Sequence, residues 1–485
     1  MELPLAETNA GTIYDVAVIG GGPAGYTAAI RAAQLGLKVA LADARPKLGG
    51  TCLHVGCIPT KALLFNAELW DHLKHAEEYG IAGIGAPQLD WAAVLRRKDA
   101  IIAKHVKGLE FLMKKHKITV VAGRGKLAGP KDGVHTIALA AEGGAASEVK
   151  TRNVILATGS EAKLLPGLKA DERILTNIEI LSIAAPPKSL IVIGAGAVGV
   201  EFGSLFRSFG AEVTILEFLP RIVPVEDEEV SKELTRLFKK RGIDVNTGAR
   251  VEKVERAKLE NGAEGVKVTY TDQNGKQQTK EAEKLLVAVG RAPQTEGLGL
   301  EATRVELERG FVKVNEAQET AEPGVFAIGD IVAGLPQLAH VGAMSGMVAA
   351  AKIAGRAYRA VRGDRIPACT YTEPQIGSVG LTEAQAKEKG YDVKVGKFPF
   401  AGNSKATIVG SHDGFVKIVA DRKYGEILGV HILGPQATEL VAEAVAVLEL
   451  EGTVEEMMST IHAHPTLSEA MLDGYAAVEG MAINA

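Results

Sequence analysis

The stretch GGTCLHVGCIPTK at residues 49–61 holds two of the chain's three cysteines, Cys52 and Cys57. On a regular helix, positions five apart are separated by about 7.5 Å along the axis and point to different sides. A disulfide needs a shorter separation, so pairing requires a break in the helix. Gly56 and Pro59 favour such a break, since glycine tolerates unusual dihedral angles and proline lacks a backbone donor. On spacing alone, two buried free cysteines are an equally good interpretation.

A strand–turn–helix–strand pattern precedes this stretch. It begins with a strand predicted at residues 14–19, continues through a helix to residue 35 and ends in a second strand at residues 37–42. A G-x-G-x-x-G sequence opens the helix, and its glycines allow a tight turn, close approach of a pyrophosphate and close helix packing. An acidic residue after the second strand suits a ribose hydroxyl. The pattern predicts a dinucleotide site made by Gly20, Gly22, Gly25 and Asp43.

The same pattern returns 174 residues later in the chain. Its glycines are Gly194, Gly196 and Gly199, and its acidic residue is Glu217. Two such units predict that the chain binds two dinucleotides, or one dinucleotide and one mimic. A glutamate at this position favours the free 2′-hydroxyl of NAD, because an arginine usually accommodates the 2′-phosphate of NADP. Arg221 lies four residues further on and leaves NADP open.

Composition is that of an ordinary globular protein. The 485 residues are 46% hydrophobic and 24% charged, with a formal net charge of −4, and about three domains are expected at this length. Such a charge gives no reason to expect binding to nucleic acid or to an anionic membrane. The longest candidate apolar stretch, at residues 440–450, contains two glutamates and is too short to span a bilayer. The first residues contain no secretory or transit signal, so we expect a soluble, cytoplasmic protein.

Three cysteines in 485 residues do not make a disulfide scaffold. In a reducing cytosol, a close pair indicates redox chemistry instead. We assign no role to Cys369 and expect no metal site. A helix predicted at residues 91–116 is rich in basic side chains, which an ordinary solvated surface explains better than a docking face in an acidic chain. These side chains are Arg96, Arg97, Lys98, Lys104, Lys107, Lys114 and Lys115.

Between and after the two dinucleotide units, the chain contains short strands and further glycine motifs. Residues 118–156 are predicted to form short strands, with a polar turn at Gly143-Gly144 and a crossing point at Thr158-Gly159. A strand ending at Asp330 could place this carboxylate near a ribityl or ribose hydroxyl, although a turn aspartate fits equally well. From about residue 361 the strands and amphipathic helices carry no cofactor motif, which favours subunit contact or substrate access.

Together, these motifs closely resemble those of the pyridine nucleotide–disulfide oxidoreductases, from about residue 13 to about residue 480. The resemblance rests on the cysteine stretch, both glycine patterns, ATGS at 157–160, VGRAP at 289–293, VFAIGD at 325–330 and HAHPTLSE at 462–469. It implies an α/β fold with two Rossmann-like domains and a C-terminal α+β interface domain in a homodimer. The implied domains are FAD-binding at 1–159, NAD-binding at 160–289, central at 290–360, completing the FAD site, and interface at 361–485.

The resemblance also implies roles for the candidate residues. Cys57 would be the thiolate in contact with the flavin, and Cys52 the thiol that exchanges with the substrate. Lys61 would lie beside the flavin and pair with Glu201. Asp43 would hold the adenosine ribose of FAD. The other implied cofactor positions are Thr158, Gly159, Asp330 and Gly290.

The histidines near the C-terminus are the implied source of acid–base chemistry. His464 would be the base that removes a thiol proton, because its ordinary pKa of about 6.5 lets it exchange protons near neutrality. Glu469 would orient its ring, and His462 would be an accessory residue. The sequence Thr466-x-x-Glu469 also fits a capping box at a helix start, and this alternative stays open here.

Among the family's members, the resemblance is closest to enzymes that oxidise protein-bound dihydrolipoamide with NAD. It implies that the protein associates noncovalently with a 2-oxo acid dehydrogenase or glycine cleavage complex and acts on the lipoyl domains of that complex. A reductase of another disulfide or metal substrate and a non-catalytic flavoprotein redox sensor are the alternatives. The chain ends GMAINA, without the cysteines found at the tails of mercuric and large thioredoxin reductases. His54, Val341 and Ser345 depart from the family pattern near the implied flavin.

Overall fold

The computed structural model describes residues 12–140 and 146–484. The predicted turn at Gly143-Gly144 lies outside the described residues. Contacts divide the chain into two compact units. Unit 1 contains the chain up to Ala62, Ala93–Lys163 and Arg291–Val361, and unit 2 contains Leu63–Ala92, Leu164–Gly290 and the chain from Arg362. The division into four domains stays a prediction.

Unit 1 is built on a seven-stranded sheet in the order β3-β2-β1-β6-β5-β4, with β19 paired to β6. Strands β1, β2, β3, β6 and β19 pair in parallel, while β4 and β5 form an antiparallel extension. The strands are β1 Ile13–Ile19, β2 Val39–Asp43, β3 Thr119–Ala122, β4 Arg124–Lys131, β5 Val134–Ala140, β6 Ala146–Leu156 and β19 Val325–Ala327. Apolar side chains on both faces of β1 are buried, as expected for a parallel sheet covered on both faces.

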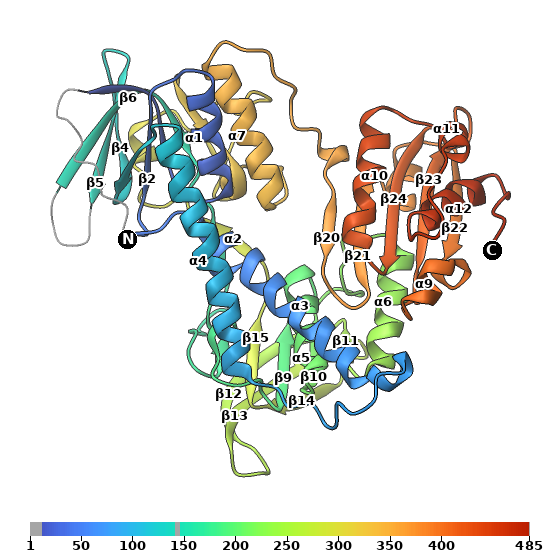
Figure 1. Cartoon of the computed structure of the whole chain (residues 1–485). Helices are drawn as coiled ribbons and strands as arrows, with labels where there is room; N and C mark the ends of the chain where they lie inside the picture. Colours follow the sequence, from blue (N-terminus) through green and yellow to red (C-terminus); the bar gives the residue numbers. More distant parts are fainter. Residues whose placement is uncertain (1–11, 141–145, 485) are drawn as a thin grey trace. The chain divides into compact units, whose positions relative to one another are not determined.

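Helices α1 Pro23–Gln34 and α7 Ala339–Ile353 pack side by side in unit 1 (Figure 1). The turn between β1 and α1 depends on the predicted glycines. A Cβ atom on Gly25 would lie 1.8 Å from the carbonyl oxygen of Gly20, so only glycine fits at that position. The same approach recurs in unit 2, where a Cβ on Gly199 would lie 1.9 Å from the oxygen of Gly194. Both predicted glycine turns are therefore confirmed.

Unit 2 contains a five-stranded parallel sheet in the order β11-β10-β9-β15-β8. Its strands are β8 Ile174–Leu175, β9 Ser189–Ile193, β10 Glu212–Glu217, β11 Asp244–Thr247 and β15 Lys284–Val287. Helix α5 Ala197–Ser208 follows the second glycine turn, and α6 Glu228–Lys240 precedes β11. A separate antiparallel sheet lies between β11 and β15 in sequence, with strands β12 Arg250–Lys258, β13 Glu264–Thr271 and β14 Gln277–Ala282.

The C-terminal part of unit 2 is an antiparallel sheet in the order β20-β21-β24-β23-β22, with helices packed on it. The strands are β20 Ala368–Thr370, β21 Gln375–Gly380, β22 Val393–Pro399, β23 Phe415–Asp421 and β24 Ile427–Gly434. The helices are α8 Glu383–Glu388, α9 Ser404–Ile408, α10 Ala437–Glu449, α11 Val454–Ser459 and α12 Glu469–Val478. Two Rossmann-like sheets and this α+β region confirm the predicted fold class.

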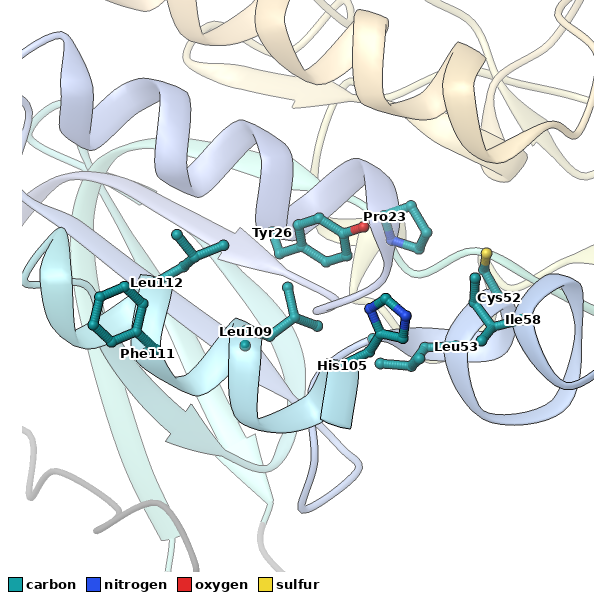
Figure 2. Close-up of a pocket in the computed structure, with 11 residues that line it drawn as sticks. Pro23, Tyr26, Cys52, Leu53, Ile58, His105, Leu109, Phe111 and Leu112 are labelled. Atoms are coloured by element: carbon teal, nitrogen blue, oxygen red, sulfur yellow. The ribbon is translucent and has the colours of Figure 1, made fainter. Parts of the chain in front are cut away.

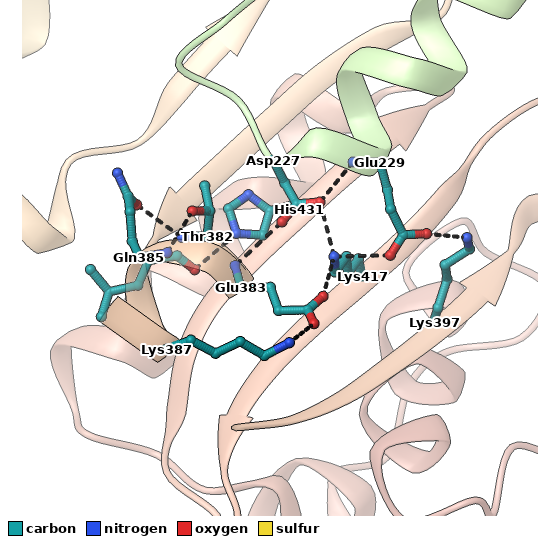
Figure 3. A network of polar contacts seen from close by, with 10 residues as sticks. Asp227, Glu229, Thr382, Glu383, Gln385, Lys387, Lys397, Lys417 and His431 are labelled. Atoms are coloured by element: carbon teal, nitrogen blue, oxygen red, sulfur yellow. Dashed lines mark hydrogen bonds and ion pairs between the residues drawn. The ribbon is translucent and has the colours of Figure 1, made fainter. Parts of the chain in front are cut away.

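A buried cluster of charges joins the start of α6 to the C-terminal sheet within unit 2 (Figure 3). Lys417 on β23 has a side chain that is only 2% exposed, and its Nζ lies 2.9 Å from Asp227, 2.9 Å from Glu229 and 2.8 Å from Glu383. Burial opposes the lysine's charge, but hydrogen bonds from these three carboxylates raise the pKa of Lys417 above its ordinary value. Removing one partner of such a cluster leaves uncompensated buried charge, which typically costs about 3–5 kcal/mol.

Across the described ranges, no helix combines the length and the apolar character needed to cross a membrane.

Candidate active site

The two close cysteines lie on either side of a helix break. Cys52 belongs to α2 Gly50–Val55, and Cys57 is the first residue of α3 Cys57–Lys74. Gly56 separates the helices, and a Cβ atom there would lie 2.9 Å from the carbonyl oxygen of Thr51. Pro59 falls in the first turn of α3, where its missing N–H costs no helical hydrogen bond. The predicted break is therefore confirmed.

Among the described residues, no disulfide joins the two cysteines of this pair, and both are half-buried. A hydrogen bond with Cys57, together with burial and the negative charge of a Cys57 thiolate, raises the pKa of Cys52. The positive charge of Lys61 opposes this shift only in part. Cys52 therefore holds its proton more tightly than an ordinary thiol does. The roles of the two sulfurs and the disulfide itself stay predictions.

A groove with a volume of about 420 Å³ opens beside Cys52 in unit 1 (Figure 2). Tyr26 of α1, Leu53 of α2 and Leu109 of α4 Trp91–Lys115 are among the mainly apolar side chains that line it. Burial, together with the charges of the two cysteines, raises the pKa of Tyr26, so its hydroxyl stays protonated. An apolar substrate arm could reach the sulfur of Cys52 along this groove. Sequence reasoning missed it, because its walls come from helices with no shared motif.

The two predicted acidic residues bind their glycine turns in the same way. In unit 1, Asp43 accepts hydrogen bonds from the amides of Gly21 at 2.5 Å and Arg45 at 2.7 Å. In unit 2, Glu217 accepts from the amides of Ala195 at 2.6 Å and Leu219 at 2.8 Å. Each carboxylate is thus fixed at the end of its second strand, and its remaining lone pairs can accept from a ribose hydroxyl.

Both dinucleotide turns can donate backbone hydrogen bonds to an anion. Gly22 precedes α1 and Gly196 precedes α5, and neither helix start has a side-chain cap. The first N–H groups of a helix have no partner within the helix, so a phosphate can accept from them. Both turns therefore fit the pyrophosphate of a dinucleotide.

A polar cluster in unit 1 brings together three of the quoted sequences. Ser160 donates to Asp330 at 2.5 Å, and Arg291 donates to Ser160 through its Nε at 2.7 Å. Thr158 donates to the carbonyl of Gln294, and Gly159 accepts from the amide of the same residue. Burial lowers the pKa of Arg291, and the negative charge of Asp330 partly opposes this shift. Sequence reasoning named Asp330 but missed Ser160 and Arg291, although both lie in the quoted sequences.

The predicted histidine–glutamate pair is formed in unit 2. His464 Nδ1 lies 2.9 Å from one carboxylate oxygen of Glu469, and the amide of Thr466 donates to the other oxygen at 2.8 Å. The hydrogen bond from Thr466, together with His464, holds the pKa of Glu469 below its usual value. The side chain of His464 is 69% exposed, so its Nε2 face is open to a substrate. His462 instead pairs with Glu443 at 3.2 Å.

The capping-box interpretation of this segment is wrong in its main part. Helix α12 begins after Ser468, not after Thr466, and no side chain caps it. Thr466 donates through its hydroxyl to the carbonyl of Ala463 instead. Only the backward contact from Glu469 to the amide of Thr466 resembles a capping box.

The remaining candidate residues lie in separate surroundings. Glu201 is buried on α5 and accepts from the amide of Tyr371, within unit 2. Lys61 belongs to unit 1, so its pairing with Glu201 stays a prediction. Gly290 follows β15 in unit 2 and has a positive φ of 104°. Of the departures, His54 donates to the carbonyl of Leu48, while Val341 and Ser345 are buried on α7.

Comparison with known proteins identifies the family. A family model described as pyridine nucleotide-disulphide oxidoreductase matches residues 14–346, and the dimerisation-domain model of the same family matches residues 366–474. The chain belongs to the pyridine nucleotide-disulphide oxidoreductases. The resemblance inferred from the motifs is thus confirmed.

Relatives and solved structures match this oxidoreductase over nearly its whole length. A dihydrolipoyl dehydrogenase of Bacillus subtilis strain 168 is 43% identical, covering 98% of this chain and 99% of its own. The crystal structure of LpdA from Mycobacterium tuberculosis has a TM-score of 0.86 and 29% identity, covering 95% of this chain and 99% of that one. The flavoprotein disulfide reductase RclA from Escherichia coli, solved as a Cu(II) complex, has a TM-score of 0.83 and 25% identity, with 96% and 99% covered.

Proposed function

We propose that this oxidoreductase is a dihydrolipoyl dehydrogenase, which oxidises protein-bound dihydrolipoamide to lipoamide and reduces NAD. The observation that carries the proposal is the pair of hydrogen-bonded thiols at the break between α2 and α3, with one of them at the end of an apolar groove. The 43% identity to a relative named for this activity supports the same substrate.

We propose that the disulfide form of Cys52 and Cys57 accepts two electrons from the dithiol. One substrate thiolate attacks the sulfur of Cys52, so a mixed disulfide forms and Cys57 leaves as a thiolate. The second substrate thiolate then closes lipoamide and releases Cys52. An ordinary thiol, with a pKa of about 8.5, is mostly protonated near neutrality, so a base is needed. His464 would take this proton at Nε2 while Glu469 holds its Nδ1–H.

FAD and NAD are the cofactors that we propose. The first glycine turn with Asp43, together with Thr158, Gly159 and Asp330, would hold FAD, and the uncapped start of α1 fits its pyrophosphate. The second glycine turn with Glu217 and Gly290 would hold NAD in the same way. When bound, the flavin carries electrons from the dithiol pair to the nicotinamide. Lys61 would stabilise negative charge near the flavin, and Glu201 would fix its ammonium group.

We propose a homodimer that works noncovalently with the lipoyl domains of a 2-oxo acid dehydrogenase or glycine cleavage complex. The match of the dimerisation-domain model supports the homodimer. Large exposed apolar side chains in the C-terminal part of unit 2 also support the homodimer. Ile461 is 97% exposed and Ile483 is 88% exposed. We also propose the cytoplasm as its location and the four domains stated above as its organisation.

The deciding experiment is turnover of free dihydrolipoamide by the purified protein, with NAD and with NADP. We expect rapid reduction of NAD and loss of activity in Cys52→Ser and Cys57→Ser. Cys369→Ser is the matched control, since it removes the only cysteine outside the pair, and it should retain activity. Reduction of another disulfide by NADH, without turnover of dihydrolipoamide, would replace the proposal with a general disulfide reductase. A flavoprotein inactive in both assays would be a redox sensor.

A further inference from the structure

Helix α4 presents a line of basic side chains, called here the basic strip and defined by Lys104, Lys107, Lys114 and Lys115. All four residues are exposed and lie in unit 1. Their spacing places them on one side of the helix, over about 16 Å of its length. In the part of the chain that the structure describes, none of the four ammonium groups makes an ion pair or hydrogen bond.

The charge of α4 is opposite to that of the rest of the chain. The helix contains seven basic and two acidic residues, a net charge of +5. The whole chain carries −4, so the remainder carries −9. Like charges at neighbouring turns repel each other and weaken the helix. Repulsion within the basic strip thus weakens α4 in the monomer, and the negative charge of an acidic partner would relieve this repulsion.

The basic strip shares one edge with the groove that leads to Cys52. Phe111 lies between Lys107 and Lys114 on α4, and its side chain is 63% exposed although it is aromatic. The same side chain lines the groove, together with Leu112. Figure 2 shows Phe111 at one end of the labelled residues and Cys52 at the other. A partner that covers the basic strip therefore sits at the mouth of a path to the reactive sulfur.

We propose that the basic strip is the docking surface for the acidic protein domain that carries the dihydrolipoyl group. This inference rests on the proposed function, in which the dithiol arrives on an arm attached to a protein. Free dihydrolipoamide is uncharged and gains nothing from four lysines, whereas an acidic domain is attracted and oriented by them. Phe111 supplies an aromatic contact of the kind that anchors protein interfaces.

The surroundings favour a small acidic domain over a nucleic acid. A long polyanion would meet the repulsion of the acidic remainder of the chain, since nucleic-acid binding depends on many phosphate contacts. A domain that contacts only one helix face would avoid most of that repulsion, because exposed charges beyond about 8–10 Å are screened.

The test compares free and protein-bound substrate in the full-length enzyme. The variant is Lys104→Glu/Lys107→Glu, and the control is Lys232→Glu/Lys239→Glu on α6, which makes the same change of charge at two exposed lysines. The probes are a reduced lipoyl domain of net negative charge and free dihydrolipoamide. For the domain, we expect kcat/KM to fall about tenfold or more at low ionic strength, through KM. For free dihydrolipoamide, kcat/KM should stay within about twofold of wild type.

Salt provides a second measurement on the same proteins. The wild type and the control should lose kcat/KM for the domain as salt is added, and the variant should show a much weaker dependence. Equal losses in variant and control, equal losses with free dihydrolipoamide, or no loss at all would overturn the inference. So would loss of binding to a short DNA duplex with unchanged turnover of the domain. If the wild type oxidises neither form of dihydrolipoamide, the proposed function itself fails.

Discussion

Glu226 offers a test of how burial controls charge in this molecule. It is only 4% exposed, and its Oε2 has no hydrogen-bond partner among the described residues. Burial raises the pKa of Glu226 from 4.5 to about 7, with a contribution from the neighbouring charge of Asp227 that Ser378 opposes by hydrogen bonding. We predict that Glu226→Gln, which keeps the shape and an acceptor oxygen, stabilises the protein at alkaline pH relative to acidic pH.

The sign and size of the effect follow from proton linkage. Between pH 4.5 and about 7, this carboxyl is protonated in the folded protein but ionised in the unfolded chain. The folded state binds more protons, so its stability falls as the pH rises through this window and stays low above it. The shift corresponds to about 3 kcal/mol above pH 8 and to less than about 1 kcal/mol at pH 5. Glutamine cannot ionise and does not lose this stability.

Urea unfolding followed by tryptophan fluorescence is the suitable measurement. Trp70 and Trp91 are the only tryptophans of the chain, and both belong to unit 2, which also contains Glu226. The fluorescence therefore reports unfolding of the unit in which the substitution lies. The free energy of unfolding of Glu226→Gln should exceed that of wild type by about 2–3 kcal/mol more at pH 8.5 than at pH 5.

Comparing the two pH values isolates the titration. A buried amide without a partner has its own cost, but that cost is the same at both pH values and cancels in the difference. Glu228→Gln is the matched control, because it makes the same chemical change at an exposed position two residues away. An equal effect of Glu226→Gln at both pH values, within about 0.5 kcal/mol, would refute the argument that burial keeps this carboxyl neutral.

Three further predictions concern the candidate site. His464→Gln should lower dihydrolipoamide oxidation about 10²-fold or more while reduction of an artificial acceptor by NADH persists, and equal losses in both assays would remove His464 from proton transfer. Glu217→Ala with Phe218→Arg should shift the ratio of kcat/KM values from NAD toward NADP, whereas an unchanged ratio would place Glu217 outside the cofactor site. Cys57→Ser should abolish the long-wavelength absorption band expected from a thiolate against the flavin and Cys52→Ser should retain it; a band in both variants would reverse the two sulfurs.

Local patterns predicted the dinucleotide units closely, because glycine turns and buried strands are specified by neighbouring residues. The second strand is the instructive exception, since it was expected from Leu37 and begins at Val39. The amides of Gly36 and Leu37 donate back to the carbonyls of Ala33 and Ala32, respectively. This Schellman-type ending of α1 includes Leu37, so the strand cannot start at that residue.

Contacts between distant segments could not be predicted in the same way. Strands were expected in the region after residue 361, but nothing in the neighbouring sequence indicates that the side chain of Lys417 is buried. The partners Asp227 and Glu383 lie 190 and 34 positions away in the sequence. A charged residue inside an apolar strand is thus a sign that a partner exists, since an unpaired buried charge is too costly. Only the folded chain shows which carboxylates supply it.

Glu469 shows that orientation of His464 and a contact with the backbone do not exclude each other. We treated orientation of His464 and closure of a helix start as competing roles, but a carboxylate has two oxygens and four acceptor positions. One oxygen meets the imidazole, and the other meets the amide of Thr466. The backbone contact is itself useful to the histidine, because it fixes the carboxylate that would hold the ring. A glutamine at this position has one acceptor oxygen, so it cannot accept both contacts through separate oxygens as Glu469 does.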